Sequence, residues 1–427
     1  MSGALLLHGV TGPQGSRLAR LLGEGAKPLA PLRGVTGCFE RIVADVSGPD
    51  SELSLAADGL PDGAARPEAI ALRLREREAR LGWGEPVEVP DLEALVDLCR
   101  ERGRSSVEMI EADPALLPGM QIGSWFDSSW RMRAARRLLR GAWRAPASLA
   151  GGDRRLAAVA DLAFWAGVRS GVGQAGWRRL TAASYVALVY HRFAGELKPG
   201  QDRIDIAPRR FRCQLRALRL AGFRPLSAED LLAFHAASRD SPPLRGAVVI
   251  TVDDAIEDCV EPLRRHAEWK PQLFVPTREL GGAAHWIDGE PVASWDEVRG
   301  LDSAGVRIGS HTRHHRLLTS LDRTTRREEL EGSLADLRER IADPLEILAY
   351  PNGDHDATVC RESRAAGYAA AFTTAKGRNG AGADLHCLKR VSVHGHDGAL
   401  AILWKASTGE GLPSSWLRLR RLLLRRG

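Results

Sequence analysis

The chain has 427 residues, of which 44% are hydrophobic and 27% charged, and its net charge is +6. This composition excludes an intrinsically disordered chain, and the length favours two or three domains over one core. The positive charge favours acidic partners, such as phosphate groups, anionic lipid or nucleic acid, without choosing among them. No apolar run reaches 18 residues, so we expect no transmembrane helix.

The first residues, Met1–Leu7, lack the basic and apolar regions of a secretory signal, so we expect no signal peptide. The six cysteines are scattered and form no CxxC motif, which is typical of reduced thiols in a cytosolic protein. We therefore predict a cytoplasmic protein and leave peripheral attachment to a membrane open.

Residues 1–90 are predicted to form a small α/β region, with strands at 4–8 and 42–45 and a loop within 60–90. The glycine-rich stretch Gly9–Gly15 follows a strand and opens a helix, as a dinucleotide fingerprint does. The chain contains no Tyr-x-x-x-Lys pair, and the region is too short for a complete dehydrogenase domain. We therefore favour a Rossmann-like remnant or cap over a nucleotide site.

Residues 91–180 are predicted to be a helical linker region rich in tryptophan and arginine. This composition also suits binding to nucleic acid or membrane, but we favour packing and expect no nucleic-acid partner. The last segment, 405–427, is predicted to form a basic amphipathic helix. An anionic membrane surface is one partner for it; docking through its leucines is the alternative that we favour. The oligomeric state is left open.

Between residues 183 and 404, strands and helices alternate. The expected strands lie near 185–190, 246–252, 272–276, 306–310, 346–350, 369–373 and 390–394. The expected helices lie near 208–221, 227–237, 256–267, 294–304, 323–342 and 356–366. Apolar strands that alternate with helices predict a parallel sheet covered by helices, and six or seven such units are enough to close a barrel. Functional side chains are then expected at the carboxyl ends of the strands.

Two polar motifs stand at such ends. Asp253 and Asp254 follow one strand, and His311 and His315 follow another. Alone, each motif has an ordinary explanation, as a helix cap or as surface histidines. Together, one carboxylate and two imidazoles suffice to hold a divalent ion and leave a position for water. The second aspartate then remains available as a base.

Residues 183–404 resemble the polysaccharide deacetylase family, also known as the NodB homology domain, which includes chitin and chitooligosaccharide deacetylases. The matching pieces occur in the family's order: TVDDA at 251–255, GSHTRHH at 309–315 and AYPNG at 349–353. The resemblance implies a distorted (β/α) barrel of about seven units and a divalent metal, usually zinc.

Carried over residue by residue, the resemblance implies that Asp254, His311 and His315 bind the metal and that Asp253 is the general base. It also implies that a histidine after the last strand protonates the leaving amine. The best candidate for that acid is His394, and the alternative is His396. The side chains expected to contact substrate are Tyr350, Pro351, Asn352, Arg390 and His191, although core packing is an equal alternative for the last.

The chain departs from the family pattern at four positions. Ala255 stands where glycine is usual, and Ala349 where many members have arginine. Asn352 replaces a common aromatic residue, and Arg316 replaces a proline. These changes affect the orientation of the base and the substrate groove more than the metal.

The predicted function is metal-dependent de-N-acetylation of a sugar in a polysaccharide, an oligosaccharide or a lipid-linked intermediate. The alternatives are a catalytically impaired carbohydrate-binding module and a membrane-associated scaffold.

Overall fold

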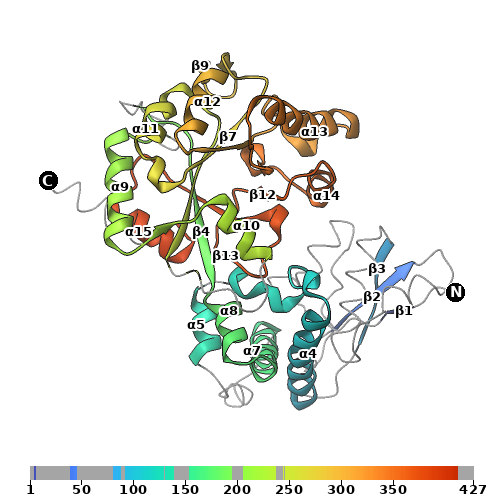
Figure 1. Cartoon of the computed structure of the whole chain (residues 1–427). Coiled ribbons are helices and arrows are strands. Elements are labelled where there is room, and N and C mark those ends of the chain that lie inside the picture. The colour runs from blue at the N-terminus through green and yellow to red at the C-terminus, as the bar shows by residue number, and fades with distance from the viewer. Residues whose placement is uncertain are drawn as a thin grey trace. The chain divides into compact units, whose positions relative to one another are not determined.

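The computed structural model describes residues 4–5, 39–45, 80–87, 92–128, 130–138, 153–194, 205–236, 244 and 246–411. The chain divides into two compact units (Figure 1): Met1–Thr181 with Gly380–Gly382, and Ala182–Asn379 with Ala383–Gly427. The predicted nucleotide motif at Gly9–Gly15 and residues 412–427 of the predicted basic helix lie outside the described residues. In the described parts of the chain, no helix is long and apolar enough to cross a bilayer.

The first unit contains an antiparallel sheet of β1 (Ala4–Leu5), β2 (Phe39–Asp45) and β3 (Arg80–Val87). Strand β3 lies where the sequence predicted a loop, because its two glycines and its proline conceal the strand pattern. The antiparallel pairing also differs from the parallel sheet that a dinucleotide-binding fold requires.

The described residues of the first unit after β3 are mainly helical, as predicted. Its helices are α4 (Leu92–Ala112), η1 (Pro114–Leu116), η2 (Gln121–Asp127), α5 (Trp130–Leu138), α7 (Asp153–Gly171) and α8 (Gln174–Thr181). The rings of Trp125 and Trp165 meet edge to face with centroids 4.9 Å apart. The Arg136 guanidinium lies 4.8 Å from the centroid of the Trp165 ring and forms an ion pair of 2.6 Å with Asp161. Tryptophan and arginine of this region therefore pack on each other.

The second unit is built on a curled sheet with the order β12-β11-β10-β7-β6-β4-β13; β5 pairs with β6, and β14 with β4. Its strands are β4 (Ser184–Tyr190), β5 (Arg224–Pro225), β6 (Ala247–Val252), β7 (Gln272–Val275), β10 (Arg307–Ser310), β11 (Ile347–Ala349), β12 (Ala370–Phe372), β13 (Asn379–Gly380) and β14 (Arg390–Ser392). A parallel bridge between Phe372 and Leu388 links β12 to the segment that continues into β14, so the sheet nearly closes. The predicted α/β class and distorted (β/α) barrel are confirmed.

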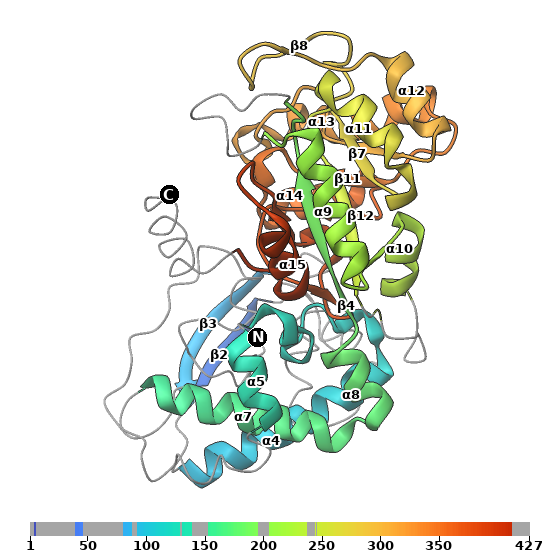
Figure 2. The same cartoon turned by 90° about the vertical axis from the view of Figure 1, so that its left-hand side faces the viewer.

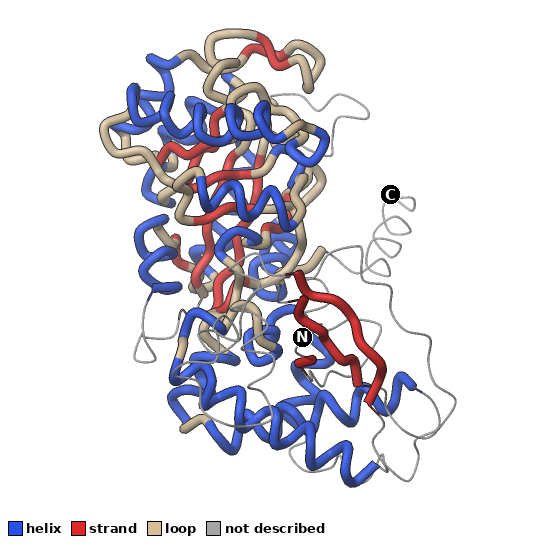
Figure 3. Tube along the Cα trace, turned by 90° about the vertical axis from the view of Figure 1, so that its right-hand side faces the viewer, coloured by secondary structure: helices blue, strands red, loops and turns tan. Residues whose placement is uncertain are grey.

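Helices surround these strands (Figure 3). They are α9 (Pro208–Leu220), α10 (Ala228–Ala236), η3 (Glu257–Cys259), α11 (Val260–Arg265), η4 (Ala267–Trp269), α12 (Trp295–Ser303), η5 (Leu318–Ser320), α13 (Arg323–Arg340), η6 (Pro351–Gly353), α14 (Ala357–Ala365), η7 (Leu385–Cys387) and α15 (Ala399–Thr408). Helices α9 and α15 pack on each other beside β4 (Figure 2). Strands β4 and β6 are buried along their whole lengths, which explains their continuous apolar sequences.

Local sequence sets the ends of the helices. Ser294 and Glu297 form a capping box at the start of α12, and Asp322 caps α13. A short antiparallel hairpin of β8 (Ala283–Ala284) and β9 (Glu290–Pro291), which was not predicted, precedes α12. Its two-residue strands are too short to give a period in the sequence.

Candidate metal centre

The two aspartates occupy a left-handed turn at the carboxyl end of β6. Asp254 has φ 70° and Ala255 has φ 52°. Neighbouring side chains on a strand point to opposite faces, so the chain must turn for both carboxylates to serve one site. Asp253 and Asp254 are 2% and 3% exposed. At Ala255 an alanine adopts a conformation that glycine adopts at lower cost, which explains why glycine is common there.

The histidine loop after β10 is also shaped by left-handed residues, Thr312 with φ 66° and His315 with φ 56°. A buried carboxylate, Glu329 on α13, accepts the main-chain N–H groups of Arg313 and His314, each at 2.9 Å. This carboxylate fixes the loop and so brings the two ends of the HxxxH motif together.

Asp254, His311 and His315 converge. The Asp254 Oδ1 atom lies 3.6 Å from His311 Nε2 and 3.2 Å from His315 Nε2. His311 Nδ1 lies 2.7 Å from the Ala349 carbonyl oxygen, so the Nδ1–H tautomer donates there and leaves the Nε2 lone pair for a cation. One carboxylate oxygen and two imidazole nitrogens form a donor set that fits a divalent transition metal such as zinc.

The electrostatics of this cluster favour a charged carboxylate. Burial raises the pKa of Asp254, but the neighbouring imidazoles of His311 and His315 outweigh it and hold the pKa well below its usual range. Burial lowers the pKa of His311, but the two aspartates outweigh it and raise this pKa above its usual value. Because a metal binds neutral imidazole, a divalent ion and a proton compete for the Nε2 atom of His311.

Asp253 is paired with an arginine from β14. Arg390 Nη1 donates to Oδ1 at 2.7 Å, and its Nη2 donates to Oδ2 at 2.8 Å. Burial raises the pKa of Asp253, but Arg390 and then His311 lower it below its usual value, so the group is ionised at neutral pH. Arg390 was predicted to contact substrate. It is fully buried, and both of its Nη groups donate to Asp253, so its side chain is not open to a ligand in this structure.

The other residues predicted to contact substrate differ in exposure. Tyr350 is fully buried, and its hydroxyl lies 3.0 Å from Ser363 Oγ and donates to the main-chain oxygen of His386 at 3.1 Å. Pro351 is also buried, so neither side chain is open to a ligand in this structure. Asn352 is exposed, with φ 55°, and His191 is partly exposed.

His191 directly follows β4. Its Nδ1 atom is buried and has no hydrogen-bond partner among the described residues. Its charge contributes to lowering the pKa of both Asp253 and Asp254, although burial and nearer partners affect those pKa values more. His191 therefore lies near the cluster, with a buried ring nitrogen that lacks a hydrogen-bond partner among the described residues.

His394 follows β14, as predicted. Its main-chain N–H donates to Asp397 Oδ2 at 2.7 Å, and its ring stacks on His396 with centroids 5.7 Å apart. Asp397 is itself paired with the buried Lys405 of α15. These contacts fix the loop backbone, and a role of His394 as an acid stays a prediction.

Sequence reasoning missed Trp286, which lies between β8 and β9. Its Nε1–H donates to Asp254 Oδ1 at 2.9 Å, and its ring stacks on His315 at 4.3 Å with 15° between the planes. The sequence carried no signal for this contact, because Trp286 lies in a spacer between a predicted strand and a predicted helix.

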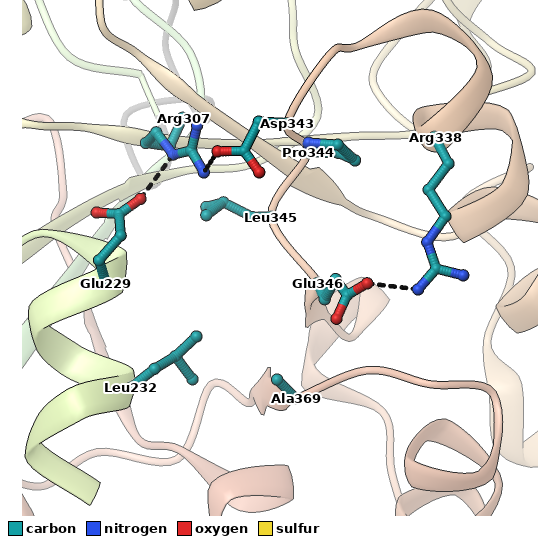
Figure 4. A pocket seen from close by; sticks show the side chains of 9 residues that line it. All are labelled: Glu229, Leu232, Arg307, Arg338, Asp343, Pro344, Leu345, Glu346 and Ala369. Carbon is teal, nitrogen blue, oxygen red and sulfur yellow. Dashed lines mark hydrogen bonds and ion pairs between the residues drawn. The ribbon is translucent and has the colours of Figure 1, made fainter. Parts of the chain in front are cut away.

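A separate pocket of about 320 Å³ opens at the opposite, amino ends of β10, β11 and β12 (Figure 4). Its charged side chains pair with one another: Arg307 with Glu229 and Asp343, and Arg338 with Glu346. The pocket contains none of the metal-ligand candidates, so the convergent donor set is a better guide to the reactive site than this cavity is.

Three comparisons place these observations among known proteins. No curated protein matches the chain. Among solved structures, a Streptococcus pyogenes deacetylase, PplD, in complex with acetate, is 19% identical with a TM-score of 0.47, over 53% of this chain and 99% of that one. A putative polysaccharide deacetylase from Bacillus anthracis is 20% identical with a TM-score of 0.44, over 52% and 69%. IcaB from Ammonifex degensii is 23% identical with a TM-score of 0.42, over 49% and 92%.

The family comparison covers the segment that carries the site. Residues 240–371 match the model of the polysaccharide deacetylase family. That segment contains both aspartates, both histidines and Trp286. This match confirms the resemblance of that part of the chain to the polysaccharide deacetylase family.

Proposed function

We propose that the chain is a metal-dependent hydrolase that removes the acetyl group from an N-acetylated sugar of a polysaccharide, an oligosaccharide or a lipid-linked intermediate. The observation that carries the proposal is the buried set of Asp254, His311 and His315. Their ligand atoms lie within 4.8 Å of one another, beside a second ionised carboxylate. The match of residues 240–371 to the polysaccharide deacetylase family supports an acetylated sugar as the substrate, and the donor set supports zinc as the ion.

A bound divalent ion supplies Lewis-acid chemistry, which makes water a stronger acid and polarises a carbonyl oxygen. The protein supplies the base: Asp253 stands next to Asp254 and is ionised, so it can accept a proton from an attacking water. The two donors of Arg390 occupy one lone pair on each Asp253 oxygen and leave others for that proton. They also fix the plane of the carboxylate.

The remaining roles follow from position. The departing amine requires a proton, and we propose that His394 supplies it from the loop after β14. We propose that the exposed Asn352 and the partly exposed His191 contact the sugar. Both follow strands that end near the donor set, β11 and β4, and neither is closed off by burial.

The test replaces Asp253 with asparagine, which keeps the shape and removes the base. Acetate release from N-acetylated oligosaccharides should fall by about 100- to 10,000-fold. Metal content by elemental analysis should stay at the wild-type value, because the ligands are untouched. The control is Asp343→Asn at the amino end of the strands. This variant should retain both acetate release and metal content. Acetate release that survives Asp253→Asn would refute the proposed base.

The second candidate is a carbohydrate-binding module with impaired turnover. Ala255 and Ala349 favour it, because both replace residues that the family commonly has near the base. A wild-type protein that holds an ion and a chitooligosaccharide but releases no acetate from any N-acetylated sugar tested would favour this candidate over the hydrolase.

A further inference from the structure

We infer that Trp286 is a positioning residue of the metal centre, which holds Asp254 and His315 in the orientation that a divalent ion requires. The inference rests on the proposed function, because it concerns the same three donors. It adds a residue from the hairpin between β8 and β9, a segment that supplies none of the donors.

Two contacts of one side chain carry the inference. The indole N–H of Trp286 donates to Asp254 Oδ1 at 2.9 Å, and this is the oxygen that faces both imidazoles. An indole N–H donates only, and a carboxylate oxygen has two acceptor positions. The bond therefore fills one position on Oδ1, leaves the other for a cation and opposes rotation of the carboxylate.

The second contact acts on the imidazole. The Trp286 ring lies nearly parallel to the His315 ring, with centroids 4.3 Å apart and 15° between the planes. A stacked neighbour limits rotation of the imidazole about its bond to Cβ. His315 Nε2 consequently stays directed at Asp254 Oδ1, 3.2 Å away. One indole thus restrains two of the three donors.

The hairpin is anchored to the same part of the barrel, so Trp286 has a fixed support. The Ala293 N–H donates to the Ala255 carbonyl at 2.8 Å, which ties the hairpin to the aspartate turn. Glu290 on β9 forms an ion pair of 2.8 Å with Arg192, a buried arginine just after β4. These two contacts therefore hold the hairpin, and Trp286 on it, in place relative to the backbone of Asp254.

A purely structural reading is that Trp286 only fills space, since it is partly buried and packs against the core of the second unit. Phenylalanine preserves most of that packing and the stacking on His315, but it has no N–H. Trp286→Phe consequently separates the two readings. Trp295→Phe is the matched control, because Trp295 is also partly buried and its ring lies under the Arg340 guanidinium, 5.3 Å from it.

The experiment uses the full chain stripped of metal and then titrated with Zn²⁺ against a competing chelator, and with Co²⁺ followed by its visible absorption. Loss of a group that orients a ligand typically weakens metal affinity by about 10- to 100-fold. We expect that loss for Trp286→Phe, together with a changed Co²⁺ spectrum. We expect wild-type affinity and spectrum for Trp295→Phe.

Equal affinity and an equal Co²⁺ spectrum for Trp286→Phe and wild type would overturn the role of Trp286 and leave the proposed function standing. A wild type that binds neither ion would overturn the proposed function itself. If circular dichroism shows that Trp286→Phe is unfolded, Glu290→Gln decides, because it loosens the hairpin from Arg192. Weakened metal binding by that folded variant supports the inference, and wild-type binding refutes it.

Discussion

In the second unit, the charged side chains at the carboxyl ends of the central strands are buried, whereas those at the amino ends are more exposed. At the carboxyl ends, Asp253, Asp254, His311 and His315 are all less than 10% exposed and lie against one another. At the amino ends, the pocket of Figure 4 is lined by ion pairs such as Arg307 with Asp343, whose side chains are 23% and 84% exposed. Burying a charged group costs free energy, so a cluster of buried charged groups indicates a functional site.

The largest effect on stability is expected where the buried pair at the carboxyl end is broken. Arg390→Ala leaves the Asp253 carboxylate buried without its counter-charge, which should lower the free energy of unfolding by about 3–5 kcal/mol. Denaturation by urea measures this change in the free energy of unfolding. Adding Asp253→Asn to that variant should restore part of the lost stability, because the buried carboxylate without a partner is gone. A double variant that is no more stable than Arg390→Ala would contradict the pairing.

A smaller effect on stability, which depends on pH, is expected at His386, whose main-chain oxygen accepts the Tyr350 hydroxyl. Burial, and then the nearby Arg364, lowers the pKa of His386 from 6.5 to about 4. Because the folded pKa is the lower one, the contribution of His386 to stability is complete above pH 6.5 and is lost as the pH falls towards 4. The shift corresponds to about 3 kcal/mol, at about 1.4 kcal/mol per unit.

Unfolding free energies at pH 7 and pH 4 check this expectation for wild type and for His386→Gln. The wild type should lose about 3 kcal/mol more than the variant over that interval, because glutamine does not titrate. Parallel losses in the two proteins would show that His386 is protonated equally in the folded and unfolded states.

The smallest effect is expected at the amino ends. Arg307→Ala removes two ion pairs, with Glu229 and Asp343, whose carboxylates are 58% and 84% exposed. Exposed pairs contribute little, so the free energy of unfolding should change by less than about 1 kcal/mol for each pair. Metal content and acetate release should remain at wild-type values. A loss of stability as large as that of Arg390→Ala would show that ion pairs at the two ends of the strands contribute equally.

Sequence patterns predicted the second unit well because its strands are continuous apolar runs and its helices are separated by turns. The expected strand at 246–252 is β6, and the expected helix at 208–221 is α9, each within a residue or two. The convergence of Asp254 with the two histidines also followed from order alone, since parallel strands present their carboxyl ends at one edge. The domain boundaries proposed at residues 90, 183 and 404 stay predictions.

Contacts between distant side chains were not predictable in this way. Arg390 lies 137 residues after Asp253, and Trp286 lies 32 residues after Asp254. Neither spacing belongs to a helix or strand period, so no local pattern connects the partners. Ala349, where many members of the family have arginine, indicated only that the orientation of the base would be affected. Which arginine takes that place depends on side-chain reach within the closed sheet.

The left-handed backbone at the metal centre has a consequence for which residues can occupy it. Besides Ala255 and Thr312, the residues with positive φ there are Asp254, His315 and Asn352. Aspartate, histidine and asparagine are the side-chain-bearing residues that tolerate this conformation best. At positions 254 and 315, the residue type that binds an ion is therefore also the type that the turn accepts. A glutamate at 254 would keep the negative charge but would suit the turn poorly, so the backbone narrows the range of acceptable ligands before any metal is bound.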